Sequence, residues 1–156
     1  MSNEDLLRPT LSDFTRVPAL YHSTGFFLSA FFGGPVGAGL YALANTARLN
    51  RLTTDGAVIL VIAAAAFLSP LEIARQGGLV PLGELLGMDP RRTGELLLRV
   101  LGLACFGAIY FRQRRFFRAA TVAGVKPLPG WVPGIAAVVL GILANRALLG
   151  WILKHH

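Results

Sequence analysis

The sequence predicts an all-α, polytopic membrane protein that folds as a bundle of four transmembrane helices. Of the 156 residues, 54% are apolar and 15% are charged, and the mean hydropathy is +0.58. Soluble domains carry about 25% charged residues. The charges are also clustered, which leaves four long stretches with few or none. A short chain is rich in surface, so its scarce charge favours lipid over water as its surroundings.

Four apolar stretches define the predicted spans. Residues 1–20 are a polar N-terminal segment, and residues 21–156 form the four-helix transmembrane domain. Twenty helical residues measure roughly 30 Å, which is the thickness of the hydrocarbon core. Three spans are the alternative, because the second and third stretches are short. The predicted spans cover about residues 25–45, 56–72, 95–112 and 130–153.

The connections suggest how the helices are arranged. The tight link at residues 48–51 predicts that the first two spans are antiparallel neighbours. Residues 79–87, in the longer second connection, have the composition of a short amphipathic helix in the interface. Basic residues are nearly balanced between the two sides, so the positive-inside rule is close to silent. The dense cluster at residues 112–118 suits the anionic cytoplasmic leaflet, and both termini are therefore expected to be periplasmic.

Small residues recur in the first stretch and predict its packing face. Gly33 and Gly37 have the small-xxx-small spacing that lets helices approach closely in lipid. Pro35 removes one backbone hydrogen bond, which predicts a kink near Phe31. A hinge or pore lining is the alternative interpretation of these residues. The predicted helix-packing residues are Ala30, Gly33, Gly34, Gly37 and Gly39.

Part of this stretch resembles a known group of proteins. Tyr21-His22-Ser23, followed by Phe-Phe-Gly-Gly-Pro-Val-Gly-Ala-Gly-Leu at residues 31–40, resembles the first span of a loose group of small bacterial inner-membrane proteins. The basic loop before Pro-Leu-Pro-Gly-Trp at residues 127–131 is compatible with their layout. The resemblance implies a location in the bacterial inner (cytoplasmic) membrane and about four helices. The group has no assigned activity, so the resemblance implies none.

Ionisable residues inside the predicted spans form a candidate polar pocket. Such a residue costs about 2.5–3.5 kcal/mol on insertion scales. Arg99 and Arg146 fall near the same leaflet, because the last two spans are antiparallel. The alternative is that both arginines snorkel to headgroups and that Glu95 pairs with Arg99 four residues along the helix. The residues of the candidate pocket are His22, Glu72, Glu95, Arg99, Asn145 and Arg146.

Aromatic and basic residues mark the predicted membrane interfaces. Trp131 and Trp151 are roughly 30 Å apart along a helix, so one indole can lie at each interface. Residues 110–118 interleave aromatic rings, which enter the acyl boundary, with guanidinium groups, which bind phosphates. The expected partner is a bilayer that contains anionic lipids. The predicted lipid-headgroup residues are Arg112, Arg114, Arg115 and Arg118.

The sequence lacks the residue sets that carry catalysis. Cys105 is the single cysteine, which excludes a disulfide framework and a thiolate metal site. Haem ligated by two histidines would need a second histidine in a span beside His22. We therefore predict no enzymatic activity, no metal and no cofactor. The net charge of +7 comes from basic residues that flank apolar spans, which argues against nucleic-acid binding.

The favoured function is that of a non-enzymatic integral membrane protein that acts through helix packing and protein or lipid contacts. An accessory subunit and an immunity-type protein are both examples of this class. Four short helices bury little surface, so we add a homo-oligomer or a larger membrane complex as a hypothesis. The alternative function is a small transporter or channel with an anion path lined by arginine and glutamate.

Overall fold

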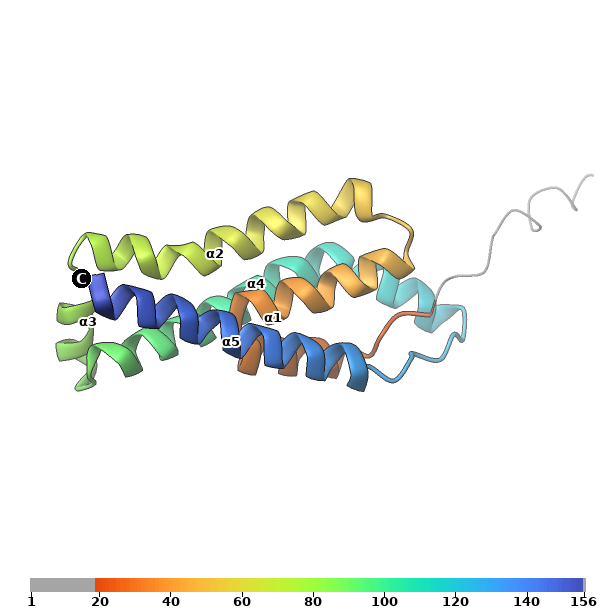
Figure 1. Cartoon of the computed structure of the whole chain (residues 1–156). Helices are drawn as coiled ribbons and strands as arrows, with labels where there is room; N and C mark the ends of the chain where they lie inside the picture. Colours follow the sequence, from red (N-terminus) through yellow and green to blue (C-terminus); the bar gives the residue numbers. More distant parts are fainter. Residues whose placement is uncertain (1–18, 156) are drawn as a thin grey trace, which may run out of the picture.

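The computed structural model describes residues 19–155 and confirms the all-α fold (Figure 1). Helices make up 85% of these residues, and no strand occurs among them. The predicted N-terminal segment lies outside the described residues up to position 18. The chain has four helices that are long and apolar enough to cross a membrane, at Ser23–Arg48, Leu52–Arg75, Pro90–Val122 and Trp131–His155.

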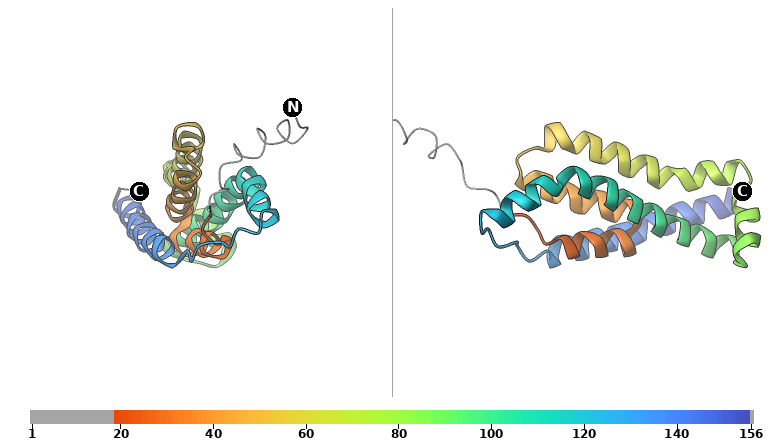
Figure 2. Two further views of the ribbon diagram at one scale, coloured as in Figure 1. Left: turned by 90° about the vertical axis from the view of Figure 1, so that its right-hand side faces the viewer. Right: turned by 180° about the vertical axis from the view of Figure 1, so that it is seen from behind.

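The elements are arranged between two ends of an elongated bundle (Figures 1 and 2). We call one the loop end, where α2 begins and where α4 is joined to α5. We call the other the α3 end, where α2 ends, α4 begins and α5 ends. The elements are α1 (Ser23–Arg48), a π-helical turn η1 (Leu52–Gly56), α2 (Ala57–Arg75), α3 (Leu79–Leu86), α4 (Pro90–Val122) and α5 (Trp131–His155).

Local sequence explains the α3 end. α3 occupies the stretch predicted to be a short amphipathic helix, and Gly87 ends it with a left-handed φ of 64°. Asp89 then caps α4, because its carboxylate accepts a hydrogen bond from the Arg92 backbone N–H at 2.9 Å. Pro90 follows in the first turn of α4, where its missing N–H costs nothing.

The backbone of α1 reverses direction at Gly34. This residue has φ 62° and ψ −153°, a conformation that is essentially restricted to glycine. Pro35 then begins the second half of the helix, a position that proline favours. The Tyr21 backbone N–H donates to Asn45 Oδ1 at 2.8 Å, although a straight helix would hold these residues roughly 36 Å apart. α1 is therefore a helical hairpin with its tip at Gly34.

This path corrects the expectation of one continuous helix that is kinked near Phe31. The halves at residues 23–33 and 35–48 are roughly 16 and 21 Å long, and they run back to back between the loop end and the middle of the bundle (Figure 1). Both ends of α1 lie at the loop end, whereas α5 ends at the α3 end. The two ends of the described chain are thus at opposite ends of the bundle.

The hairpin forms the centre of the core. In the most apolar window of α1, 61% of the residues are buried, against 22% in α2 and α5, so the outer helices shield α1. The Phe26 and Tyr41 rings of the two halves stack with centroids 5.6 Å apart. A Cβ atom at Gly141 would collide with the Gly33 backbone, and one at Gly102 would collide with Gly34. Close packing over glycine is what brings α4 and α5 against the hairpin.

All five predicted helix-packing residues are buried inside the bundle. Gly33 and Gly34 contact α5 and α4, and a side chain at Gly37 would collide with the other half of the hairpin. Gly39 adjoins α2, since a Cβ atom there would lie 2.8 Å from the Ala63 methyl group. The small-residue face is therefore used within the chain, which leaves none of it for a partner protein.

Candidate functional site

A polar pocket lies where α1, α4 and α5 meet, on the α3 side of the hairpin tip. Its volume is about 180 Å³. It contains four of the six residues that the sequence predicted to share a pocket, together with apolar side chains from all three helices. The lining residues are Phe32, Glu95, Leu98, Arg99, Ile142, Asn145, Arg146 and Leu149.

Asn145 connects the pocket to the hairpin tip. Its Nδ2 donates a hydrogen bond to the Gly33 carbonyl oxygen at 3.3 Å. Its Oδ1 is buried and accepts no hydrogen bond from any described residue. A buried polar atom without a partner costs about 1–3 kcal/mol, so this oxygen is suited to accept a hydrogen bond from water or from a protonated group in the pocket.

The two arginines of the pocket have no carboxylate partner. Neither Arg99 nor Arg146 forms an ion pair with any described residue. The guanidinium carbon of Arg99 lies 5.9 Å from the centroid of the Phe31 ring, within the range of a cation–π contact. The pocket therefore carries an excess of positive charge beside the hairpin tip.

The predicted pair between Glu95 and Arg99 is replaced by another. Glu95 Oε1 lies 3.6 Å from Arg91 Nε. Arg91 is on the same helix face as Arg99 but precedes Glu95 by four residues, whereas Arg99 follows it by four. Arg99 is directed over Phe31 of α1 instead. A contact between helices thus decides between two local pairs that have equal spacing.

Two predicted pocket residues lie elsewhere. His22 caps α1 at the loop end, where its Nδ1 accepts a hydrogen bond from the Thr24 backbone N–H at 3.1 Å. The reversal of α1 keeps His22 at the opposite end from the pocket. Glu72 is exposed near the end of α2 and contacts its own helix, through Arg75 at 3.9 Å and Gln76 at 3.0 Å.

Among the predicted lipid-headgroup residues, Arg112 is engaged inside the protein. It donates to Asp55 Oδ1 at 3.0 Å, and Arg51 lies 3.0 Å from Oδ2 of the same carboxylate. Asp55 is only 8% exposed, so this cluster joins α4 to η1. Arg114 and Arg115 lie over neighbouring aromatic rings at the exposed end of α4, and Arg118 lines a cavity beside the start of α1.

The predicted interface anchors lie at opposite ends of α5. Trp131 begins the helix at the loop end and is 73% exposed. Trp151 is 44% exposed near the α3 end and stacks on His155 with ring centroids 4.7 Å apart. The two indoles thus bracket a length of helix that matches the hydrocarbon core.

Sequence reasoning missed the hairpin and the role of Asp55. A signal for the first was present, because Gly-Pro dipeptides mark turns as readily as kinks. The role of Asp55 had a weaker signal in the sequence, because its carboxylate comes to lie between Arg51 and Arg112 only when the chain is folded.

Comparison of the chain with family models, with curated proteins and with solved structures gave no match. The geometry of the chain is therefore the basis for assigning its function.

Proposed function

We propose that the chain is a small, non-enzymatic membrane channel or transporter that binds an anion in the pocket at the hairpin tip. The observation that carries this proposal is the pair Arg99 and Arg146, which line one pocket and have no carboxylate partner among the described residues. Ionisable groups within a bilayer are costly, and in membrane proteins they commonly mark an ion pathway.

The depth of the pocket supports this role. Arg146 lies one and a half helical turns before Trp151, roughly 7.5 Å along α5 from that indole. The hairpin tip lies deeper still, since Gly33 contacts Gly141. A backbone break at membrane depth is tolerated where protein buries it or where it lines a polar cavity. Gly34 is buried and adjoins this pocket through Asn145.

The hairpin adds to the positive potential. The half at residues 35–48 begins at the tip and runs toward the loop end, so its N-terminus is directed toward the pocket side. Helix N-termini carry a partial positive charge and favour anions. Transporters with broken helices bind their ions at such half-helix ends, and the same physical effect is available here.

The orientation of the proposed pathway follows from the basic residues. The loop end carries more of them than the α3 end, which favours a cytoplasmic loop end by the positive-inside rule. The pocket then opens toward the opposite side of a bacterial inner membrane, a location that the resemblance of the first span supports. The basic residues are Arg48, Arg51, Arg112, Arg114, Arg115, Arg118 and Lys126 at the loop end, and Arg75, Arg91, Arg92 and Lys154 at the α3 end.

A function based on partner contacts, as an accessory subunit or an immunity-type protein, now has less support. Its support came from the lack of catalytic residue sets in the sequence and from a glycine packing face on the first span. Gly33 and Gly37 are buried within the chain, so a partner would have to bind the exposed apolar side chains of α2 and α5. Such side chains are equally expected where a helix simply contacts lipid.

Anion efflux from liposomes tests the proposal. Purified protein is reconstituted, and efflux of chloride and of inorganic phosphate is measured for the native sequence, Arg99→Ala and Arg146→Ala. We expect either variant to lower the flux roughly tenfold or more, since contacts of a charged group contribute about 1.5–3 kcal/mol and each 1.4 kcal/mol is about tenfold.

Arg92→Ala is the matched control. Arg92 is exposed at the same end of α4 and contacts Asp89 at 3.4 Å, outside the pocket, so its removal should leave the flux unchanged. The proposal is contradicted if the folded native protein passes neither anion, or if all three variants behave alike.

A further inference from the structure

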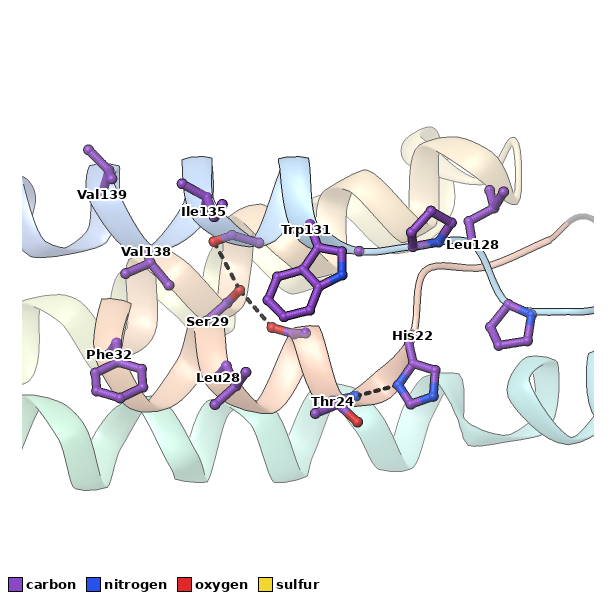
Figure 3. Close-up of a pocket in the computed structure, with 15 residues that line it drawn as sticks. His22, Thr24, Leu28, Ser29, Phe32, Leu128, Trp131, Ile135, Val138 and Val139 are labelled. Atoms are coloured by element: carbon purple, nitrogen blue, oxygen red, sulfur yellow. Dashed lines mark hydrogen bonds between the residues drawn. The ribbon is translucent and has the colours of Figure 1, made fainter.

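A second and larger cavity is a groove between the first half of α1 and the first half of α5 (Figure 3). Its volume is about 570 Å³, within the range of ligand sites. Leu28 and Phe32 line it from α1, and Ile135 and Val138 line it from α5. His22 lies at the other end of the groove, toward the loop end, as Figure 3 shows. The groove is thus apolar along its length and polar at its mouth.

Gly134 contributes to the α5 wall of the groove. Gly134 of α5 has no side chain to fill the space, and a Cβ atom there would lie 3.7 Å from the Tyr41 ring and 3.8 Å from Ser29 Oγ. Ser29 lines the groove, whereas Tyr41 is fully buried in the core behind Gly134. The Ser29 hydroxyl donates to the Gly25 carbonyl oxygen at 2.8 Å, and the Tyr41 hydroxyl donates to the His22 carbonyl oxygen at 2.8 Å. Because the Ser29 hydroxyl proton is already used within the protein, the groove suits a hydrocarbon chain.

A cationic side chain lies in the cavity that adjoins the groove at His22. A neighbouring cavity of about 440 Å³ shares His22 and Pro127 with the groove and is lined by Arg118. Arg118 is exposed and forms no ion pair with any described residue. Since His22 Nδ1 accepts a hydrogen bond, the neutral ring carries its proton on Nε2, which is a donor. Arginine is well suited to hold a phosphate group through two parallel hydrogen bonds.

We propose that this groove binds one acyl chain of an anionic phospholipid, whose phosphate is held at its mouth by Arg118 and His22. The apolar lining of the groove matches the acyl chain of such a lipid, and Arg118 in the adjoining cavity matches its phosphate. The site is separate from the anion pocket, and it shares only Phe32 with the lining of that pocket.

Tryptophan fluorescence tests the proposal, because Trp131 lines the groove and Trp151 does not. The chain has two tryptophans, so Trp151→Phe and Trp131→Phe each leave one reporter near a membrane interface. Each variant is reconstituted in phosphatidylcholine vesicles that contain a small fraction of acyl-brominated phosphatidylglycerol, and bromine quenching is measured. We expect Trp131 to be quenched more than the bulk lipid fraction predicts, and Trp151 to follow the bulk fraction.

Further variants separate the acyl chain from the phosphate. In the Trp151→Phe background, Gly134→Leu fills the groove and should abolish the excess quenching. Gly150→Leu is the control on the same helix, because nothing lies within 4 Å of a Cβ atom there. Arg118→Gln should abolish the preference for phosphatidylglycerol over brominated phosphatidylcholine. Circular dichroism and size-exclusion chromatography verify that each variant is folded.

Three results would overturn the proposal. One is bulk-level quenching of Trp131 in the folded protein. A second is equal excess quenching by brominated phosphatidylcholine, which would mean that the mouth does not select the phosphate charge. The third is protection of Trp131 from every brominated lipid, which would mean that a second copy of the chain covers the groove.

Discussion

Asp55 is nearly buried where η1 meets α4, and two arginines surround its carboxylate. Arg51 and Arg112 each approach within 3.0 Å from different elements. The two arginine side chains are 39% and 48% exposed, so water screens part of the attraction. Arg112 donates two hydrogen bonds to Oδ1, and Arg51 lies beside Oδ2 as an ion pair, so this single side chain fixes the start of α2 against α4.

Asp55→Asn should therefore destabilise the protein. The change leaves two guanidinium groups facing each other without a carboxylate, and we expect a loss of about 2 kcal/mol in the free energy of unfolding, the range for hydrogen bonds to charged groups after screening. Thermal unfolding in detergent measures this loss. Glu84→Gln is the control, since Glu84 is exposed and forms no ion pair with a described residue, and such surface changes stay within about 0.5 kcal/mol.

Gly34 is the residue on which the hairpin depends. Gly34→Ala should cost about 1–3 kcal/mol, because only glycine tolerates its backbone conformation, and the new Cβ atom would lie 2.7 Å from Asn145 Nδ2. Gly107→Ala on α4 is the matched change, with nothing within 4 Å of its Cβ position, and it should be neutral or slightly stabilising. Equal unfolding temperatures for the two variants would show that position 34 is not strained.

At the scale of elements, hydropathy and charge were sufficient to locate α2, α4 and α5 but not the path of α1. A long apolar run such as residues 56–72 has few alternatives to a spanning helix. Gly34-Pro35 is compatible with a kink, in which Pro35 removes one backbone hydrogen bond, and with a reversal, in which all hydrogen bonds across the dipeptide are lost. Contacts far apart in the sequence, such as the stacking of Phe26 on Tyr41, select the reversal, and no local pattern encodes them.

Contacts far apart in the sequence also limited what could be predicted of the candidate pocket. The antiparallel order of the last two spans placed Arg99 and Arg146 near one leaflet, and the pocket contains both. It could not place His22, because that residue's position depends on the reversal of α1. Nor could it choose the partner of Glu95, since Arg91 and Arg99 are equally spaced from it along the helix.

Distances across α1 test the hairpin directly. The Arg48 guanidinium carbon lies 4.7 Å from the centroid of the Tyr21 ring, whereas a straight helix would separate these residues by roughly 40 Å. Spin labels at Tyr21→Cys and Arg48→Cys, in a Cys105→Ala background, should give a short distance by electron paramagnetic resonance. A distribution centred near the straight-helix value would disprove the reversal.

At the scale of the whole molecule, the hairpin determines which segments share a side of the membrane. Only α2, α4 and α5 connect the loop end to the α3 end, because both ends of α1 are at the loop end. The polar pocket lies on the α3 side of the hairpin tip, while the hairpin occupies the bundle between the tip and the loop end.

Sidedness follows from this arrangement and can be measured with single cysteines in the Cys105→Ala background. Ser23→Cys and Lys126→Cys should react with a membrane-impermeant thiol reagent from one side, the cytoplasm. Met88→Cys and Lys154→Cys should react only from the other side.

The labelling of position 23 distinguishes two paths of the chain. If α1 were a straight span, position 23 would lie on the same side as position 88, because the first span would separate position 23 from the link at residues 48–51. The side on which position 23 reacts thus distinguishes a hairpin from a crossing helix. The side on which position 126 reacts tests independently whether the basic loop end is cytoplasmic.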